Sequence, residues 1–436
     1  MSGPVSGPVR GPVRVTVVGI GADGWPGVPE RLRAVVTGAE VLLGGERHLA
    51  LVPAVPGQAR EPWPSPLRAG LPALLERYAG RTVVALASGD PFVSGIGTTL
   101  VDLLGPDAVR AEPAVSSVAL ARARLGWSAE GSVVVSAVGR DVRRVLRELA
   151  PGRRVLVLSA DATTPGDLAA LLAMSGWGAA RLVVLGDLGA PGESRLEATA
   201  QEWADTPPVF GDLTVVAVEA PAVVPADAPV TWAAGLPDEA FEHDGQLTKR
   251  DLRASALARL APYPGALLWD VGAGAGSIGV EWMRAHPACR TVAVEADAQR
   301  AARVRRNAGR LGVPDLRVVH GAAPDALAGL PAPDAVFVGG GATRPGVLEA
   351  CVAALRPGGR VVVHGVTVET EALLARWHGE RGGELTRHVV ETATPIGSFR
   401  GFTPARAVTQ WAWTAPAEHP AEHPAEHPAD HPEEPA

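Results

Sequence analysis

Cysteine, aromatic residues and long apolar runs are all scarce in this chain of 436 residues. Its two cysteines, Cys289 and Cys351, cannot build a disulfide framework, so we expect a reducing, cytoplasmic location. Aromatic residues make up only 4% of the chain, which means that its cores must consist mainly of valine, leucine and alanine. No stretch of about 18 residues is both apolar and free of charge, so we expect no transmembrane helix and no membrane partner.

A basic surface is missing as well. The formal net charge is −7, and six acidic residues between 416 and 436 contribute most of it. The rest of the chain is therefore close to neutral. Because proteins that bind nucleic acids need a basic stripe to face the phosphates, we expect no nucleic-acid partner.

Three segments rich in proline divide the chain. Residues 1–13 repeat Gly-Pro-Val, residues 221–229 contain three prolines, and residues 416–436 repeat Ala-Glu-His-Pro. Such compositions are typical of flexible segments. We therefore predict a disordered leader (1–13), a linker (221–229) and a disordered acidic tail (416–436) around two folded domains at 14–220 and 230–415.

The tail carries histidines at every fourth position, namely His419, His423, His427 and His431. On a helix this spacing would place them on one face, where they could bind a metal ion. The prolines between them exclude such a helix. We therefore predict no metal site, with weak binding of cobalt, nickel or zinc as the alternative.

Apolar runs of strand length alternate with helical stretches in both predicted domains. This alternation predicts α/β domains with mostly parallel sheets. The runs in the first domain are 13–20, 82–87, 132–138, 155–159, 182–185 and 213–219, and those in the second are 267–271, 291–295, 316–319, 335–338 and 360–363.

A glycine-rich loop follows the first strand of the second domain. Its glycines, Gly272, Gly274 and Gly276, allow a tight turn and a close approach of the backbone to a ligand. Asp270 precedes the first glycine by two residues, and Glu295 ends the next strand, where its carboxylate can accept both hydroxyls of a ribose. This combination favours S-adenosylmethionine (SAM), with a nicotinamide or flavin cofactor or a purely structural turn as alternatives.

The residues 235–241 and 247–253 and the loop 270–276, in that order, resemble the CbiT-type corrin methyltransferases, and the resemblance spans about 230–412. It implies a Rossmann-like class I SAM methyltransferase domain that methylates C15 of a precorrin and decarboxylates the ring-C acetate. It also implies that Thr248, the backbone of 272–276, Glu295 and Ala323 contact SAM, although Ala322 stands where relatives often have an acid. Lys249 and Arg253 then lie at the mouth of the site as candidate catalytic residues, and Arg250, Arg253 and Arg344 are candidates for binding substrate carboxylates.

The first domain opens with Gly19-Ile20-Gly21-Ala22-Asp23-Gly24, which has the spacing of a dinucleotide-binding fingerprint. Pro26 and Pro29 exclude a helix that begins directly on this loop and receives a pyrophosphate. The spacing alone is therefore weak evidence for NAD.

Other segments of this domain resemble the CbiE-type branch of the tetrapyrrole methylase superfamily. They are 88–98, 112–117, 125–127 and 186–189, within a resemblance that spans about 14–220. It implies a tetrapyrrole methylase domain of two α/β subdomains with SAM in the cleft between them. The implied SAM contacts are Gly19, Gly21, Asp90, Ser94, Gly95, Ser116 and Ser117. Asp23 is a candidate substrate contact or base, or else the acid that stabilises its own turn.

Taken together, the two halves resemble the fused CbiE-type/CbiT-type corrin methyltransferases of cobalamin biosynthesis. The resemblance implies two SAM sites, a tetrapyrrole substrate of the precorrin-6Y type, methylation at C5 and C15, and precorrin-8X or its cobalt-containing counterpart as product. We expect a homo-oligomer. The alternatives are a SAM-dependent RNA methyltransferase and a noncatalytic SAM-binding scaffold of the same pathway.

Overall fold

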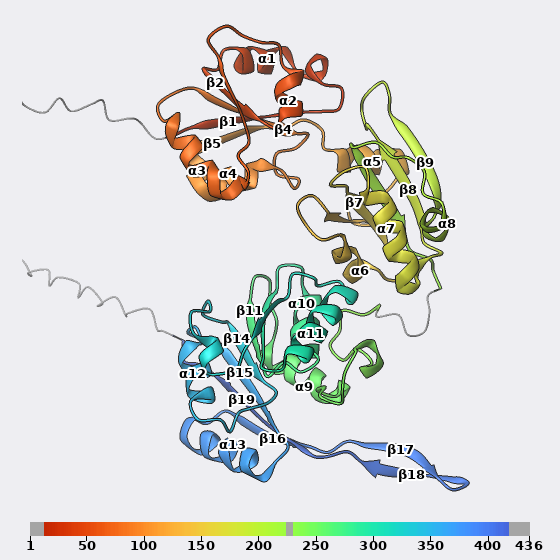
Figure 1. Ribbon diagram of the computed structural model, residues 1–436, viewed down its shortest axis with the longest axis vertical. Helices are drawn as coiled ribbons and strands as arrows, with labels where there is room; N and C mark the ends of the chain where they lie inside the picture. Colours follow the sequence, from red (N-terminus) through yellow and green to blue (C-terminus); the bar gives the residue numbers. More distant parts are fainter. Residues whose placement is uncertain (1–12, 224–229, 418–436) are drawn as a thin grey trace, which may run out of the picture. The chain divides into compact units, whose positions relative to one another are not determined.

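The computed structural model describes residues 13–223 and 230–417. The predicted leader, linker and histidine-rich tail therefore lie wholly or mostly outside the described residues. Contacts within the chain divide it into two compact units, residues 1–226 and 227–436 (Figure 1).

The first unit begins with a parallel five-stranded sheet in the order β3-β2-β4-β1-β5. Two of its inner strands, β1 and β4, are apolar on both faces because helices cover both sides of the sheet. The strands are β1 (Val15–Ile20), β2 (Val41–Gly44), β3 (Ala59–Pro62), β4 (Val83–Ser88) and β5 (Val109–Glu112), and the helices are α1 (Glu30–Thr37), α2 (Glu46–Leu51), α3 (Leu67–Arg77) and α4 (Ile96–Leu104).

A second sheet of this unit has the order β6-β7-β10-β8-β9, and only its β6–β7 pair is parallel. The expectation of a mostly parallel sheet is wrong here, because an apolar run records burial and not strand direction. The elements are α5 (Ser117–Leu125), β6 (Val133–Ser136), α6 (Val145–Glu148), β7 (Arg154–Leu158), α7 (Thr164–Leu172), β8 (Arg181–Gly186), β9 (Ser194–Thr199), α8 (Ala200–Asp205) and β10 (Thr214–Glu219).

The second unit contains a seven-stranded sheet in the order β13-β12-β11-β14-β15-β19-β16. The first five strands are parallel, and β19 is antiparallel to both of its neighbours. The chain reverses its direction of travel across the sheet between β11 and β14, and ligands of open α/β sheets bind at the carboxyl ends of the strands beside such a point. The strands are β11 (Leu267–Val271), β12 (Arg290–Glu295), β13 (Arg317–His320), β14 (Ala335–Val338), β15 (Arg360–Gly365), β16 (Glu384–His388) and β19 (Val408–Thr414).

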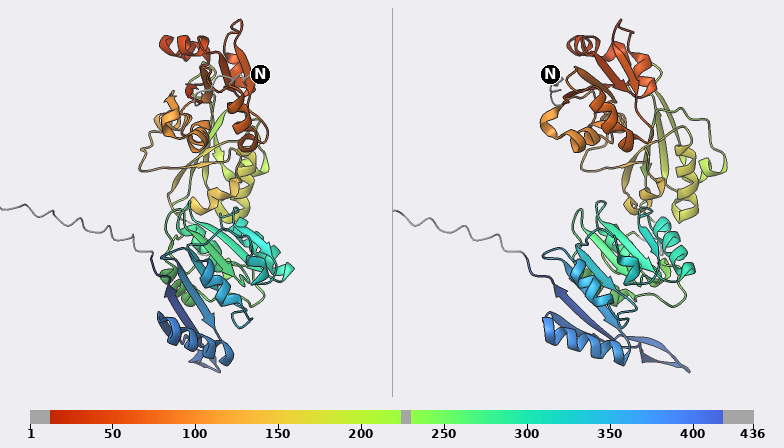
Figure 2. Two further views of the ribbon diagram at one scale, coloured as in Figure 1. Left: turned by 90° about the vertical axis from the view of Figure 1, so that its left-hand side faces the viewer. Right: turned by 60° about the vertical axis from the view of Figure 1, so that its left-hand side comes forward.

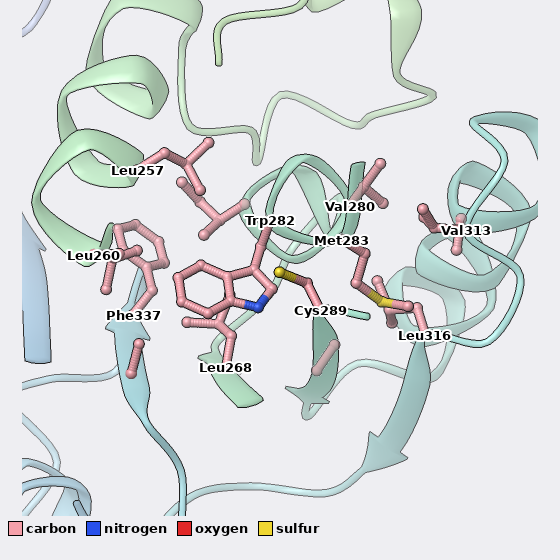
Figure 3. Packing of buried hydrophobic residues seen from close by; sticks show 14 of the residues in the cluster. Leu257, Leu260, Leu268, Val280, Trp282, Met283, Cys289, Val313, Leu316 and Phe337 are labelled. Carbon is pink, nitrogen blue, oxygen red and sulfur yellow. The ribbon is translucent and has the colours of Figure 1, made fainter. Parts of the chain in front are cut away.

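Helices cover both faces of this sheet, and alternate residues of β11 pack into two different hydrophobic cores. Leu268 packs with Trp282 and Leu257 on one face, as Figure 3 shows, while Trp269 packs with Leu374 on the other. Trp282 is fully buried, and its indole N–H points to the carbonyl of Ala266. The helices are α9 (Arg250–Leu260), α10 (Ser277–Ala285), α11 (Ala298–Arg310), α12 (Val347–Ala354) and α13 (Val368–Arg381).

A two-stranded hairpin of β17 (Glu391–Ile396) and β18 (Phe399–Pro404) forms a sheet of its own. It extends away from the seven-stranded sheet as a narrow arm (Figures 1 and 2). Ile396, Phe399 and Phe402 are exposed on it. The chain therefore presents apolar side chains to solvent at this arm.

Candidate functional site

A cavity of about 940 Å³ opens at the carboxyl ends of the parallel strands in the second unit. This is the edge of the sheet where the topology places a ligand. Five segments of the chain line it, together with residues of β14, β15, β16 and the approach to β19. The segments, which are loops and the adjoining ends of helices and strands, are 245–252, 271–274, 294–296, 321–323 and 339–341.

The glycine-rich loop forms one wall of this cavity. A Cβ atom on Gly272 would lie 2.8 Å from the Gly340 carbonyl oxygen, and one on Gly274 would lie 2.8 Å from that of Gln246. Both glycines have positive φ, so no other residue fits here without moving the neighbouring backbone. The third glycine has a different task. A Cβ on Gly276 would lie 2.7 Å from Val304, so this glycine lets α10 pack against α11.

Asp270 lies beneath the loop and not among the residues that line the cavity. Its carboxylate accepts a hydrogen bond from the Gly279 N–H in α10 at 3.0 Å. Burial raises the pKa of Asp270 to about 7, and the nearby carboxylate of Glu295 contributes to the increase. The acid therefore holds the helix that follows the loop.

Glu295 has a geometry that suits a diol. The side chain is buried, and one carboxylate oxygen accepts the Gly274 N–H at 2.7 Å while the other accepts the Asp297 N–H at 3.0 Å. A carboxylate has about four acceptor positions, so each oxygen keeps one free. These backbone bonds fix the carboxylate at the cavity wall, where it can accept the two hydroxyls of a ribose. The residues present therefore fit the adenosyl group of SAM.

The structure gives the predicted pair Lys249 and Arg253 different surroundings, although both form ion pairs with Asp238. Lys249 lies at the cavity, is exposed, and forms an ion pair with Asp238 at 3.3 Å. The expectation that Arg253 lies at the mouth is wrong, because its side chain is completely buried. Its guanidinium binds Glu281 at 2.5 Å and donates hydrogen bonds to the carbonyls of Leu236 and Thr248. Arg253 therefore holds the Thr248 loop from behind.

Three arginines at the cavity have no carboxylate partner among the described residues. Arg344 donates a hydrogen bond to the Ala323 carbonyl at 3.2 Å, which places it at the predicted adenine loop. Arg250 and Arg406 are exposed, and both line the cavity. Cations without a bound anion suit a substrate that carries several carboxylates.

Sequence reasoning missed His364, His388 and Arg406, all of which line the cavity. His364 follows directly on the predicted strand 360–363, so its place at the end of a central strand was a usable signal. His388 ends β16 and Arg406 precedes β19, and neither of these strands was predicted from the sequence. No sequence signal connected them to the site.

In the first unit, several predicted residues meet where β1 and β4 end. A Cβ on Gly19 would lie 2.0 Å from the Gly89 carbonyl oxygen and 2.6 Å from the Ala114 nitrogen. Gly89 in turn packs against the backbone of Ser116 and Ser117. Three loops of the chain therefore converge here with their backbones in direct contact.

Polar side chains at this convergence form hydrogen bonds with the backbone of their own turn or helix end. Asp90 accepts the Phe92 N–H at 2.8 Å, and Ser116 caps α5 by accepting the Ala119 N–H at 3.1 Å. Ser94 adopts a positive φ, and a Cβ on Gly95 would lie 2.6 Å from the Pro91 carbonyl oxygen.

Asp23 is exposed, and its carboxylate lies over Gly21 and Gly27. A Cβ on Gly21 would lie 2.5 Å from one Asp23 oxygen, and a Cβ on Gly27 would lie 1.8 Å from the other. Its side chain therefore occupies the space that these two glycines leave.

Known proteins resemble this chain along most of its length. A precorrin-6Y C(5,15)-methyltransferase [decarboxylating] from a Sinorhizobium species is 46% identical over 404 residues, which cover 92% of this chain and 96% of the relative. The chain belongs to this family. A relative with the same name from Mycobacterium tuberculosis is 44% identical over 402 residues, which cover 92% of this chain and 99% of the relative.

Two family models divide the methyltransferase chain in the predicted order. The tetrapyrrole (corrin/porphyrin) methylases match residues 14–204, and the precorrin methyltransferase domain matches residues 239–415. The predicted fold class and family are confirmed, and SAM-dependent methyl transfer follows from membership. The two alternatives, an RNA methyltransferase and a noncatalytic scaffold, find no support. The crystal structure of the C-terminal domain of precorrin-6Y C5,15-methyltransferase from Rhodobacter capsulatus is 42% identical and covers 42% of this chain and 99% of its own, with a TM-score of 0.40.

Within 13–223 and 230–417, no helix has both the length and the apolar character that crossing a membrane requires. The same part of the chain contains no group of three or more histidine, cysteine, aspartate or glutamate side chains arranged to hold a metal ion.

Proposed function

We propose that this chain methylates precorrin-6Y at C5 and C15 and removes the ring-C acetate as CO2, which gives precorrin-8X. The end-to-end match to two relatives with this printed activity carries the proposal. The first unit would methylate C5, and the second would methylate C15 and release CO2. The same reactions apply to a precorrin substrate that already carries cobalt in its ring.

Each half would bind its own SAM. When bound, SAM supplies a methyl group on a sulfonium, so the protein needs no strong nucleophile of its own. The residues of the second unit would hold and orient SAM. Glu295 would accept the ribose hydroxyls, and the 272–274 backbone would pack along the ligand. The first unit would bind the other SAM molecule, and the close packing of the loops around Gly19 and Gly89 supports a site there.

The cavity of the second unit also suits the proposed substrate. Its volume is at the upper end of the range of about 300–1,000 Å³ that is typical of small-molecule sites, so it offers more room than one small ligand requires. A precorrin carries many acetate and propionate groups. Arg250, Arg344 and Arg406 are available to bind them.

Incubation of the full chain with precorrin-6Y and SAM, followed by mass spectrometry, tests the proposal. We expect a product with two added methyl groups and one CO2 lost. A product with methyl groups on RNA, or SAM binding without turnover of precorrin-6Y, would contradict it.

We also propose that copies of this chain associate. The arm formed by β17 and β18 exposes Ile396, Phe399 and Phe402, and exposed apolar groups of this kind favour protein contacts. Light scattering of the wild type and of a Phe399→Ser/Phe402→Ser variant tests this, with a smaller mass expected for the variant. The cytoplasmic location stays a prediction.

A further inference from the structure

The cavity of the second unit has two ends, which follow from the order of the strands. The glycine loop, Glu295 and Ala323 follow β11, β12 and β13, on one half of the sheet. The other half consists of β14, β15, β19 and β16. It contributes Phe337, His364, His388 and Val408 to the same cavity. Register places these residues at one edge, because His388 pairs with Val408 and Gly365 pairs with Thr409.

His364 is the polar group of this second end that lies deepest. The residue is 9% exposed, and the ring of Phe337 meets its imidazole edge-on with the ring centroids 5.0 Å apart. Burial lowers the pKa of His364 to about 4, against the effect of its hydrogen bond to Gln410, and the charges of His388 and Arg259 lower it further. The imidazole is therefore neutral at physiological pH.

A polar layer behind the cavity wall fixes this imidazole. Gln410 is fully buried, and its side-chain oxygen lies 2.8 Å from His364 Nε2 and accepts a hydrogen bond from the Ser255 hydroxyl at 3.3 Å. The amide nitrogen of Gln410 has no hydrogen-bond partner among the described residues. An unpaired buried amide is unfavourable for folding. The contact that Gln410 does make is the one through its oxygen, which fixes the orientation of the His364 imidazole.

The side chains that line the cavity differ in charge between its exposed part and its buried wall. Arg250 and Arg406 are exposed where they line the cavity, while the buried wall formed by Phe337 and His364 carries no charged side chain of its own. A cation beside a carboxylate stabilises the charged reactant, so it opposes loss of neutral CO2, whereas neutral surroundings leave the carboxylate less stable. The two environments therefore suit two kinds of carboxylate on one substrate.

We propose that the acetate which leaves as CO2 binds against this neutral wall beside His364, while the exposed arginines hold the carboxylates that remain. This inference rests on the proposed function. In the step, the bond between the methylene carbon and the carboxylate carbon breaks, and CO2 leaves. The electron pair moves into the conjugated imine of the macrocycle, and a proton from water then converts the methylene into a methyl group.

The test places a positive charge at the wall of the full-length enzyme. Val366 lines the cavity two residues after His364 and is 45% exposed, so Val366→Lys can fold with its ammonium at the wall. Val368 is 78% exposed and does not line the cavity, which makes Val368→Lys the matched control. His364→Lys places the charge at the proposed contact itself, and His364→Asn keeps a neutral hydrogen-bonding group there.

We measure CO2 release from precorrin-6Y, C5 methylation by the same chains, and SAM binding. Release should fall about tenfold or more in Val366→Lys and His364→Lys, a change that corresponds to one new charge near the carboxylate. It should stay within about fivefold of wild type in His364→Asn and be unchanged in Val368→Lys, with C5 methylation and SAM affinity unchanged throughout.

Unchanged CO2 release in Val366→Lys and His364→Lys would overturn the inference. Equal losses in His364→Asn and His364→Lys would do so too, because charge would then not be the cause. If the wild type releases no CO2 from precorrin-6Y, the proposed function itself fails.

Discussion

At the scale of single residues, the Glu295 carboxylate holds two backbone N–H groups and is also the proposed acceptor for the ribose of SAM. Glu295→Ala removes the proposed acceptor for two ribose hydroxyls and leaves the Gly274 and Asp297 N–H groups without their partner. Each hydrogen bond to a charged group contributes about 1.5–3 kcal/mol, so we expect SAM affinity of the second unit to fall about 100-fold or more. Radiolabelled methyl transfer at C15 and CO2 release should be lost with it.

The internal control for Glu295→Ala is C5 methylation by the same chains, which should be spared. Glu295→Gln keeps the shape and one acceptor oxygen, and it should retain more activity than the alanine variant. Survival of both C15 methylation and CO2 release in Glu295→Ala would show that the SAM site of the second unit lies elsewhere.

Asp270 predicts a pH dependence of stability. Burial raises the pKa of Asp270 from its ordinary value of 3.8 to about 7, so between these pH values the folded state holds a proton that the unfolded state has released. Between these two pH values the free energy of unfolding therefore falls as pH rises. The decrease is at most about 1.4 kcal/mol for each unit of the pKa difference, and above pH 7 it is complete. Asp270→Asn, which is neutral at every pH, should lack this loss.

Scanning calorimetry of wild type and Asp270→Asn at pH 5 and pH 8 checks this prediction. The difference in stability between the variant and the wild type should shift in favour of the variant when the pH is raised from 5 to 8. An identical pH dependence in the two proteins would mean that Asp270 is charged in the folded chain.

Sequence reasoning was effective for residues that follow a recognisable strand. Gly272 and Glu295 directly follow or end apolar runs, so parallel-sheet geometry places them at the cavity edge. Arg253 was misplaced because a sequence does not show whether a charge has a buried partner. Glu281, an acid within the apolar stretch of α10, was the sign of such a partner.

At the scale of elements, the first turns of α9 depend on one buried cation. Arg253→Met removes the bonds from α9 to the Leu236 and Thr248 carbonyls and leaves Glu281 without its cation. Breaking a buried ion pair costs about 3–5 kcal/mol, so we expect a loss of stability of this size. Faster hydrogen exchange should appear in peptides that cover 235–249, and SAM affinity should fall because Thr248 lines the cavity.

Arg259→Met provides the matched control for Arg253→Met. Arg259 lies on the same helix and pairs with the half-exposed Glu384, so its loss should cost about 1 kcal/mol or less. Equal effects of the two substitutions on exchange and stability would contradict the assigned role of Arg253.

Element type could be read from the sequence more reliably than element direction. The run 213–219 correctly indicates β10, yet β10 is antiparallel to both β7 and β8. An apolar strand with helices on both faces has the same pattern in either direction. The strands β16 to β18 escaped prediction for a different reason. Their residues are largely exposed, so they lack a continuous apolar run.

At the scale of the whole molecule, each compact unit has its own loop convergence at strand ends. In the first unit Gly19 and Gly89 pack backbone against backbone, and in the second Gly272 packs against Gly340. Each of these backbone contacts lies within a single unit. The two proposed SAM sites should therefore be lost independently of each other.

Equilibrium dialysis with SAM on the full chain tests this independence. Gly19→Ala pushes a methyl group into the Gly89 carbonyl and should remove the first site, while Gly192→Ala, which meets nothing within 4 Å, is its control. We expect the wild type and Gly192→Ala to bind two SAM per chain, Gly19→Ala and Glu295→Ala to bind one each, and the double variant to bind none. The activities should divide in the same way, with C5 methylation lost in Gly19→Ala and C15 methylation lost in Glu295→Ala. If the wild type binds a single SAM that one substitution abolishes and the other leaves untouched, one half of the chain has no cofactor site.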